Sequence, residues 1–255
     1  MKTITRTIVW EKYHKTLEYP INMLIFIMTY NLNNSTSPLA LTFGIEIETG
    51  GISYPQYGRL LAEKGLKGFK SVDDGSGRVD AEIVTCPLTP CRTAWEFISN
   101  LTTAMNEIGT DRLGDSNRLI NTGCGLHVHV GNAFLNDGVD PDEYCRKSIE
   151  AFGTTGARYH LDHQDPMEFE IYRDVAYRCS YQQDVLDSMN YKSRRNNRYC
   201  SPIGIVLDDI KAASDRQQLA AALRRADINY HSKFSAITLE TWGKGTIEFR
   251  QHGGT

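Results

Sequence analysis

The fold of this chain is set by one short stretch, Phe43-Gly44-Ile45-Glu46-Ile47-Glu48-Thr49, an apolar run interrupted at two alternate positions by carboxylates. In an extended strand, successive side chains point to opposite faces, so Glu46 and Glu48 share one face and the isoleucines share the other. Like charges this close oppose each other's ionisation unless a cation lies between them, and such oxygen pairs bind Mg²⁺. The stretch predicts a strand whose acidic face either binds a metal or is exposed to water.

The same alternation recurs elsewhere in the chain. It is found in Leu126-His127-Val128-His129-Val130 and Thr246-Ile247-Glu248-Phe249-Arg250, and a single carboxylate opens Ala81-Glu82-Ile83-Val84-Thr85. If these strands share one sheet, one face is apolar and packs on a core. The other face gathers Glu46, Glu48, Glu82, His127, His129, Glu248 and Arg250. Such a charged face can bind divalent cations and an anion.

Helices are predicted between these strands from apolar spacing and capping residues. The predicted helices are 55–64, 90–108 (capped by Thr89 and ended by Gly109), 141–152 (capped by Asp140), 183–189 and 215–227 (capped by Ser214). The side chains predicted to face inward on three of them are Leu60 and Leu61, then Tyr144, Ile149 and Phe152, and then Leu219, Ala222, Leu223 and Ala226. Residues 68–80 predict a turn-rich loop, and 234–239 with 246–250 predict a hairpin. The expected fold class is α+β, with a curved, mainly antiparallel sheet and helices on one face.

Composition limits the class of protein. The chain has 255 residues, of which 40% are hydrophobic and 23% charged, with a net charge of −3, as is typical of globular proteins and unlike nucleic-acid or anionic-membrane binders. The apolar stretch 21–30 is about half as long as a membrane-spanning helix. The six cysteines are scattered without a C-x-x-C pair, which predicts buried thiols and a cytoplasmic location.

One domain boundary is predicted, between residues 38 and 39. Residues 1–38 are predicted to be an N-terminal extension and linker, and residues 39–255 a catalytic domain. The chain stops directly after the Glu248 strand, where a natural domain rarely ends. We therefore expect a truncated C-terminus.

Six motifs in order resemble the amidoligase branch of the glutamine-synthetase-like carboxylate–amine ligases. They are F-G-I-E-I-E (43–48), D-G-S (74–76), A-E-I-V-T-C-P-L (81–88), C-G-L-H-V-H-V-G (124–131), R-Y-C-S-P (198–202) and T-I-E-F-R-Q-H-G-G-T (246–255). The resemblance implies the fold of a glutamine-synthetase or glutamate–cysteine-ligase catalytic domain. It also implies a reaction in which ATP phosphorylates a carboxylate and an amine attacks the acyl phosphate, giving an amide or isopeptide bond.

The resemblance also implies roles for residues. The metal nearer the nucleotide would be held by Glu46, His127 and Glu248, and the metal nearer the acid by Glu48 and Glu82. The metal would be Mg²⁺, with Mn²⁺ as an alternative. Arg250 and Arg198 would contact phosphate during catalysis, and His129 would hold a substrate or support His127. Cofactor-binding positions would be Asp74, Ser76, Arg198 and Arg250.

The partners and two rival functions remain open at this point. The resemblance names neither acid nor amine, although residues 153–198, rich in Tyr, Arg and Asp, suit a groove for a peptide or protein tail. One rival is a zinc-dependent hydrolase using His127, His129 and a carboxylate. The other is a non-catalytic module that binds nucleotide or peptide, a relic of the enzyme fold.

Overall fold

A computed structural model describes residues 42–74, 79–114, 119–120, 124–131, 139–152, 169–189, 200–226, 235–238 and 245–253. These ranges belong to one compact unit, Ala40–Gly254. The predicted extension 1–38 lies outside the described residues, as do the predicted site residues Ser76 and Arg198.

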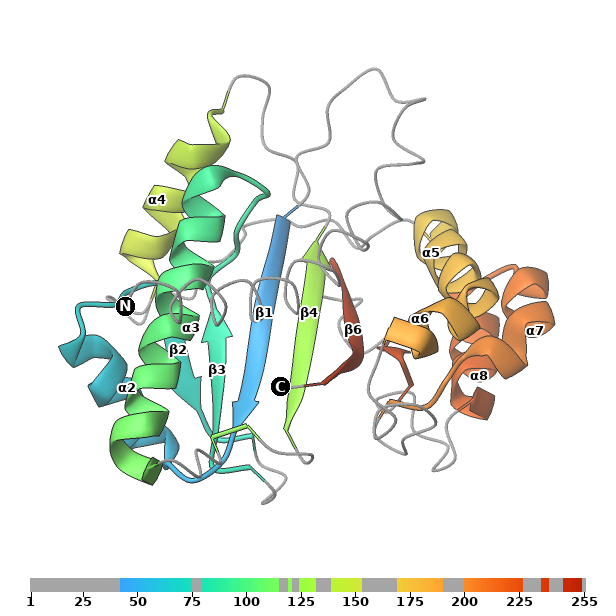
Figure 1. The fold of residues 1–255 in the computed structure, drawn as a ribbon. Helices are drawn as coiled ribbons and strands as arrows, with labels where there is room; N and C mark the ends of the chain where they lie inside the picture. The colour runs from blue at the N-terminus through green and yellow to red at the C-terminus, as the bar shows by residue number, and fades with distance from the viewer. Residues whose placement is uncertain are drawn as a thin grey trace, which may run out of the picture. The chain divides into compact units, whose positions relative to one another are not determined.

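The described part of the chain is α+β, with one six-stranded sheet whose order is β2-β3-β1-β4-β6-β5 (Figure 1). The strands are β1 (Thr42–Thr49), β2 (Phe69–Val72), β3 (Ala81–Thr85), β4 (Gly125–Gly131), β5 (Ile237–Thr238) and β6 (Thr246–Gly253). Every neighbouring pair runs antiparallel. The four strands predicted from alternating residues therefore exist and are adjacent, with the Glu46 strand between the Glu82 and His127 strands.

Strand register brings the polar residues together. Residues directly opposite each other on neighbouring strands share a face. Three pairs of this kind are Glu46–His127, Glu48–Glu82 and His129–Glu248. The register of β4 against β6 shifts between Leu126 and Val128, where the partners are His252 and Phe249. Two residues of β6 thus face the single residue His127, and this bulge begins at Arg250.

The other face of the sheet is apolar, as predicted. Its side chains are almost fully buried: Ile45, Ile47, Ile83, Val128, Val130, Ile247 and Phe249. Phe43, which points the same way, stacks on Trp95 with ring centroids 5.8 Å apart. Trp95 belongs to α3, so this helix packs on the apolar face.

Seven α-helices occur among the described residues. They are α2 (Tyr54–Glu63), α3 (Arg92–Leu113), α4 (Pro141–Ala151), α5 (Phe169–Tyr181), α6 (Gln183–Met189), α7 (Leu207–Ala212) and α8 (Arg216–Ala226), with a 3₁₀ turn η4 (Gly204–Val206) before α7. Helices α2, α3 and α4 contact one another in sequence order, whereas α5, α7 and α8 form a second group around η4. None of these helices combines the length and apolar character needed to cross a bilayer.

The prediction for α3 was wrong at both ends. The helix begins after Cys91, not Thr89, because its second amide, that of Thr93, donates a 2.8 Å hydrogen bond to Asp142 Oδ1 from α4. It also continues past Gly109, which is buried within the helix, and ends at Gly114, where φ is +67°. A cap supplied from a distant helix leaves no local sequence signal.

Other local predictions held only in part. Helix α8 buries the predicted Leu219, Ala222, Leu223 and Ala226, but its cap is Asp215, one residue after the predicted Ser214. In α4 the predicted cap Asp140 is confirmed, while the buried side chains are Cys145 and Ser148. The predicted inward residues Tyr144, Ile149 and Phe152 are half-buried. In α2 the buried pair is Tyr57 and Leu61, with Leu60 half-buried.

Two elements were missed by the sequence prediction. The predicted loop 68–80 contains β2, all four residues of which are half-buried and therefore lack an alternating pattern. Helix α5 lies in the Tyr-, Arg- and Asp-rich segment 153–198, where no helix was predicted before residue 183. It buries Tyr172, Val175, Ala176 and Cys179, a spacing of three and four residues that is itself the helical signal. The predicted 183–189 helix is present as α6.

Candidate metal centre

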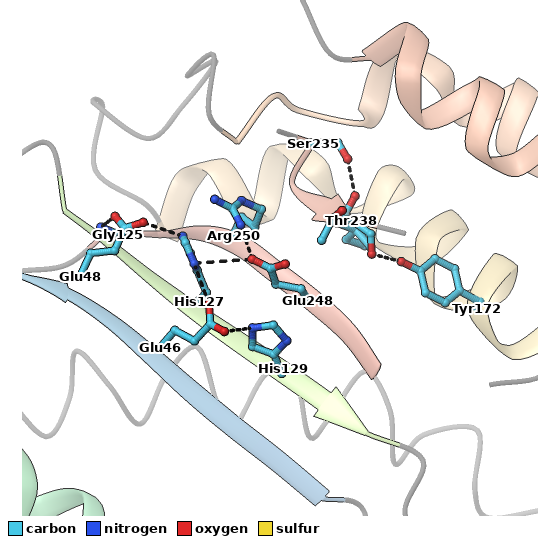
Figure 2. Close-up of polar contacts among 11 residues, drawn as sticks. Glu46, Glu48, Gly125, His127, His129, Tyr172, Ser235, Thr238, Glu248 and Arg250 are labelled. Carbon is cyan, nitrogen blue, oxygen red and sulfur yellow. Dashed lines mark hydrogen bonds and ion pairs between the residues drawn. The ribbon is translucent and has the colours of Figure 1, made fainter. Parts of the chain in front are cut away.

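A cluster of carboxylates and imidazoles lies on the polar face, where β1, β4 and β6 run side by side (Figure 2). The sequence places these side chains there because alternate positions of a strand share one face. Of the residues predicted for the site, Figure 2 shows Glu46, Glu48, His127, His129, Glu248 and Arg250 pointing toward one another. Glu82 joins them from β3, opposite Glu48.

Glu46 is the centre of this cluster. Its Oε1 lies 2.9 Å from His129 Nε2, and its Oε2 lies 3.3 Å from His127 Nδ1. The same Nδ1 atom is 3.5 Å from Glu248 Oε1, and the other ring nitrogen, Nε2, is 3.6 Å from Glu48 Oε1. His127 is thus surrounded by three carboxylates, and only 5% of its surface is exposed.

Two sets of side chains have ligand atoms close enough to hold a metal ion. One is Glu46, His129 and Glu248, and the other is Glu46, Glu82 and His127. Within each set the ligand atoms lie within 4.8 Å of one another. Glu46 belongs to both sets, and each set contains one imidazole. The grouping therefore differs from the predicted one, in which Glu48 paired with Glu82 and His129 was not a ligand.

The charges of the cluster are poorly balanced without a cation. Burial raises the pKa of Glu82, and the charge of Glu46 raises it further, so Glu82 retains its proton at neutral pH. Burial would also raise the pKa of Glu46, but contacts with the imidazoles of His127 and His129 hold it well below its usual range. A divalent cation would replace the proton between these carboxylates and favour the ionised form of both.

Unsatisfied polar atoms give an independent indication of a ligand. His129 Nε2 is buried and lies 2.9 Å from Glu46 Oε1 as an ion pair, but it has no hydrogen-bond partner among the described residues. Arg250 Nε is also buried without such a partner in the described part of the chain. Buried nitrogen and oxygen atoms are normally paired, so the cluster fits bound ions better than a closed hydrogen-bond network.

Glu48 is positioned by a backbone group. The Gly125 amide donates a 2.5 Å hydrogen bond to Glu48 Oε2. A Cβ atom at residue 125 would lie 2.8 Å from His127 Nε2 and 2.9 Å from Glu48 Oε2, closer than real Cβ contacts occur. A larger residue at position 125 would therefore displace the His127 ring or the Glu48 carboxylate. Gly125 was not among the residues predicted for the site, because no local sequence pattern marks its contacts with these two side chains.

Arg250 lies at the β6 bulge, and its Nη1 donates to Glu248 Oε1. Bulges next to functional sites commonly redirect a side chain. The neighbouring strand β5 is anchored from the helical side, where the buried Tyr172 hydroxyl donates to the Thr238 carbonyl (Figure 2). Because Thr238 lies opposite Glu248, this hydrogen bond supports the part of β6 that carries Glu248. Tyr172 was not singled out by the sequence analysis.

Of the predicted nucleotide contacts, the structure describes Asp74 and Arg250. The charge of Asp74 contributes to the raised pKa of Glu82, so Asp74 lies near the β3 side of the cluster. Comparison with protein-family models, curated proteins and solved structures finds no match to this chain.

Proposed function

We propose that this chain is an ATP- and Mg²⁺-dependent carboxylate–amine ligase with a glutamine-synthetase-like catalytic fold, as its motifs imply. The observation that carries the proposal is the shared ligand Glu46, whose two oxygens face different imidazoles and which belongs to both ligand sets. Arg250 lies beside these sets through its contact with Glu248. Two cations with an adjacent guanidinium are what phosphoryl transfer requires, because it depends on positioning and on neutralising phosphate oxygens.

The reaction would proceed in two displacements. The acid substrate's carboxylate oxygen attacks the γ-phosphorus of ATP and ADP leaves; the amine then attacks the acyl carbon and phosphate leaves. Bound Mg²⁺ would supply charge neutralisation on the phosphates. Arg250 would contact the transferring phosphoryl oxygens, since a guanidinium can make two parallel hydrogen bonds to them. Its contact with Glu248 orients it, and its Nε has no partner among the described residues.

The zinc-hydrolase alternative receives less support from the same geometry. A zinc site built from the H-x-H motif would place His127 and His129 on one ion. In the described residues the two imidazoles fall in different ligand sets, each completed by two carboxylates. Sets rich in carboxylate suit Mg²⁺ or Mn²⁺ better than zinc.

Thermal melting with Mg²⁺ or Mn²⁺, alone and with a non-hydrolysable ATP analogue, tests the proposal without knowledge of the substrates. A ligand at a hundred times its dissociation constant stabilises the native state by about 2.7 kcal/mol. We expect this stabilisation in the wild-type chain and its loss in Glu46→Gln, because both ligand sets lose a member. The matched control is Glu96→Gln, an exposed glutamate on α3 that should respond as the wild type does.

Turnover is then measured as ADP release, with hydroxylamine as the amine and panels of small acids and peptides as the acid. Hydroxamate formation that requires Mg²⁺ and is lost in Glu46→Gln would support the ligase. Stabilisation by zinc alone, with no response to nucleotide, would instead favour the hydrolase. Nucleotide-dependent stabilisation without ADP release for any acid would favour a non-catalytic binding module.

A further inference from the structure

Two thiols lie close together where the start of α3 meets α4, and the proposed function does not involve them. Cys91 directly precedes α3, and Cys145 is a buried residue of α4. Their sulfur atoms are 3.4 Å apart, and both cysteines are free. The Cys91 thiol also lies 3.6 Å from the Pro141 carbonyl oxygen, so it is directed toward the first turn of α4.

The backbone around the two thiols is held in place by hydrogen bonds between the same two segments. The Thr93 amide donates to Asp142 Oδ1 over 2.8 Å. The Thr89 amide donates to Cys145 Sγ over 3.3 Å, and the Cys145 thiol lies 3.5 Å from the Thr89 carbonyl oxygen. These contacts join residues on both sides of Cys91 to α4, so the two sulfur atoms are kept close by the fold.

The two thiols differ in access. Cys91 is partly exposed, whereas Cys145 is fully buried. Burial raises the pKa of the Cys145 thiol to about 12, so this thiol is a poor first target for an oxidant. A small oxidant would therefore reach Cys91 first, and Cys145 would be the thiol already in place to react with the oxidised sulfur.

We propose that Cys91 and Cys145 are a reversible oxidation site, at which a hydroperoxide converts the two thiols to a disulfide. In the first step the Cys91 sulfur attacks the peroxide oxygen, the O–O bond breaks, and with hydrogen peroxide a sulfenic acid and one water form. The Cys145 sulfur then attacks the Cys91 sulfur. The S–O bond breaks, and the hydroxide takes the thiol proton and leaves as a second water. Two thiols are oxidised and one peroxide is reduced.

The closure requires little movement. A disulfide has an S–S distance of about 2.05 Å, so the sulfur atoms must approach by roughly 1.3 Å from their present 3.4 Å. The bond would close a loop over residues 92–144 and thereby restrict the unfolded chain. We expect the melting temperature of the oxidised protein to rise by roughly 5–10 °C. This inference is independent of the proposed function.

The experiment treats the full chain with hydrogen peroxide under native conditions. The protein is then unfolded in denaturant with N-ethylmaleimide to block the remaining thiols, and is digested with trypsin. Cleavage leaves Cys86 and Cys91 together in peptide 79–92, and Cys124 and Cys145 together in peptide 119–146. Fragmentation of the linked peptides by mass spectrometry therefore has to assign the bond. We expect a Cys91–Cys145 link that dithiothreitol reverses.

Matched variants show which cysteine of each peptide forms the bond. Cys91→Ser and Cys145→Ser should each abolish the link, and serine suits position 91 because it is a preferred N-cap residue. Cys86→Ala and Cys124→Ala each remove the other thiol of a peptide and should retain the link. The proposal is overturned if N-ethylmaleimide still modifies both Cys91 and Cys145 completely after peroxide treatment. It is also overturned if the disulfide link runs through Cys86 or Cys124.

Discussion

The two faces of the sheet are built from alternate residues of the same strands, and they differ in what they contribute to the native state. On β3, Ile83 is fully buried in the apolar face, while its neighbours Glu82 and Val84 are half-buried on the polar face. Burial of the apolar face stabilises the fold by roughly 25 cal/mol for each Å² removed from water.

The polar face lowers the stability of the fold. Its carboxylates are largely buried next to one another, and one of them, Glu82, is kept protonated by burial and by the charge of Glu46. Burying like charges and unpaired nitrogen atoms costs free energy unless a ligand compensates. The apolar face therefore stabilises the fold, whereas the polar face costs free energy unless the proposed ions bind there. Substitutions on the two faces should therefore have separable effects.

The largest expected effect comes from the apolar face. Ile83→Ala removes a side chain with no exposed surface and should lower the free energy of unfolding by about 2–5 kcal/mol. Val84→Ala, one residue along on the other face, should cost less than about 1 kcal/mol because Val84 is half-buried. Urea titration of both variants measures the difference. Equal losses would contradict the assignment of the two faces.

A smaller effect should separate binding from stability on the polar face. Gly125→Ala places a methyl group against His127 and Glu48, and we expect metal affinity to fall at least tenfold, about 1.4 kcal/mol. Gly44→Ala is the matched control, since its Cβ would meet only the Thr85 hydroxyl at 4.0 Å. Calorimetric titration with Mn²⁺ compares them. If the two glycine variants bind alike, the close approach at residue 125 is not important for the site.

The smallest effect concerns the buried side chain of Tyr57 in α2, whose hydroxyl is a weak acid. Tyr57 is fully buried, its hydroxyl has no hydrogen-bond partner among the described residues, and burial raises its pKa. The unfolded chain releases this proton near pH 10 while the folded chain keeps it. Stability is therefore fully present below pH 10 and falls above it by about 1.4 kcal/mol per pH unit.

Tyr57→Phe removes this pH dependence. Between pH 8 and pH 11, the free energy of unfolding of the variant should therefore rise by about 1.4 kcal/mol relative to that of the wild type. Melting across that range measures it. At neutral pH the two proteins should differ by no more than about 1 kcal/mol, because the hydroxyl makes no hydrogen bond with the described residues. Parallel pH profiles would mean that Tyr57 ionises as easily in the folded chain as in the unfolded one.

Much of the site could be predicted because its residues lie on strands. The alternation around Glu46, His127 and Glu248 correctly assigned each side chain to its face. Gly125 was missed because its importance comes from two side chains above it, which no local pattern reveals. Similarly, the start of α3 depends on Asp142, a residue 49 positions away from Thr93.

By itself the sequence determined which residues of each strand share a face, because a strand repeats every two residues whatever its neighbours are. It also determined the burial stripe of α8, since a helix has its own period. Only the tertiary structure decided that Glu46 is shared by two ligand sets, that a bulge begins at Arg250, and that two distant thiols touch. These features depend on hydrogen-bonded register and packing between segments far apart in the chain, which local periodicity does not encode.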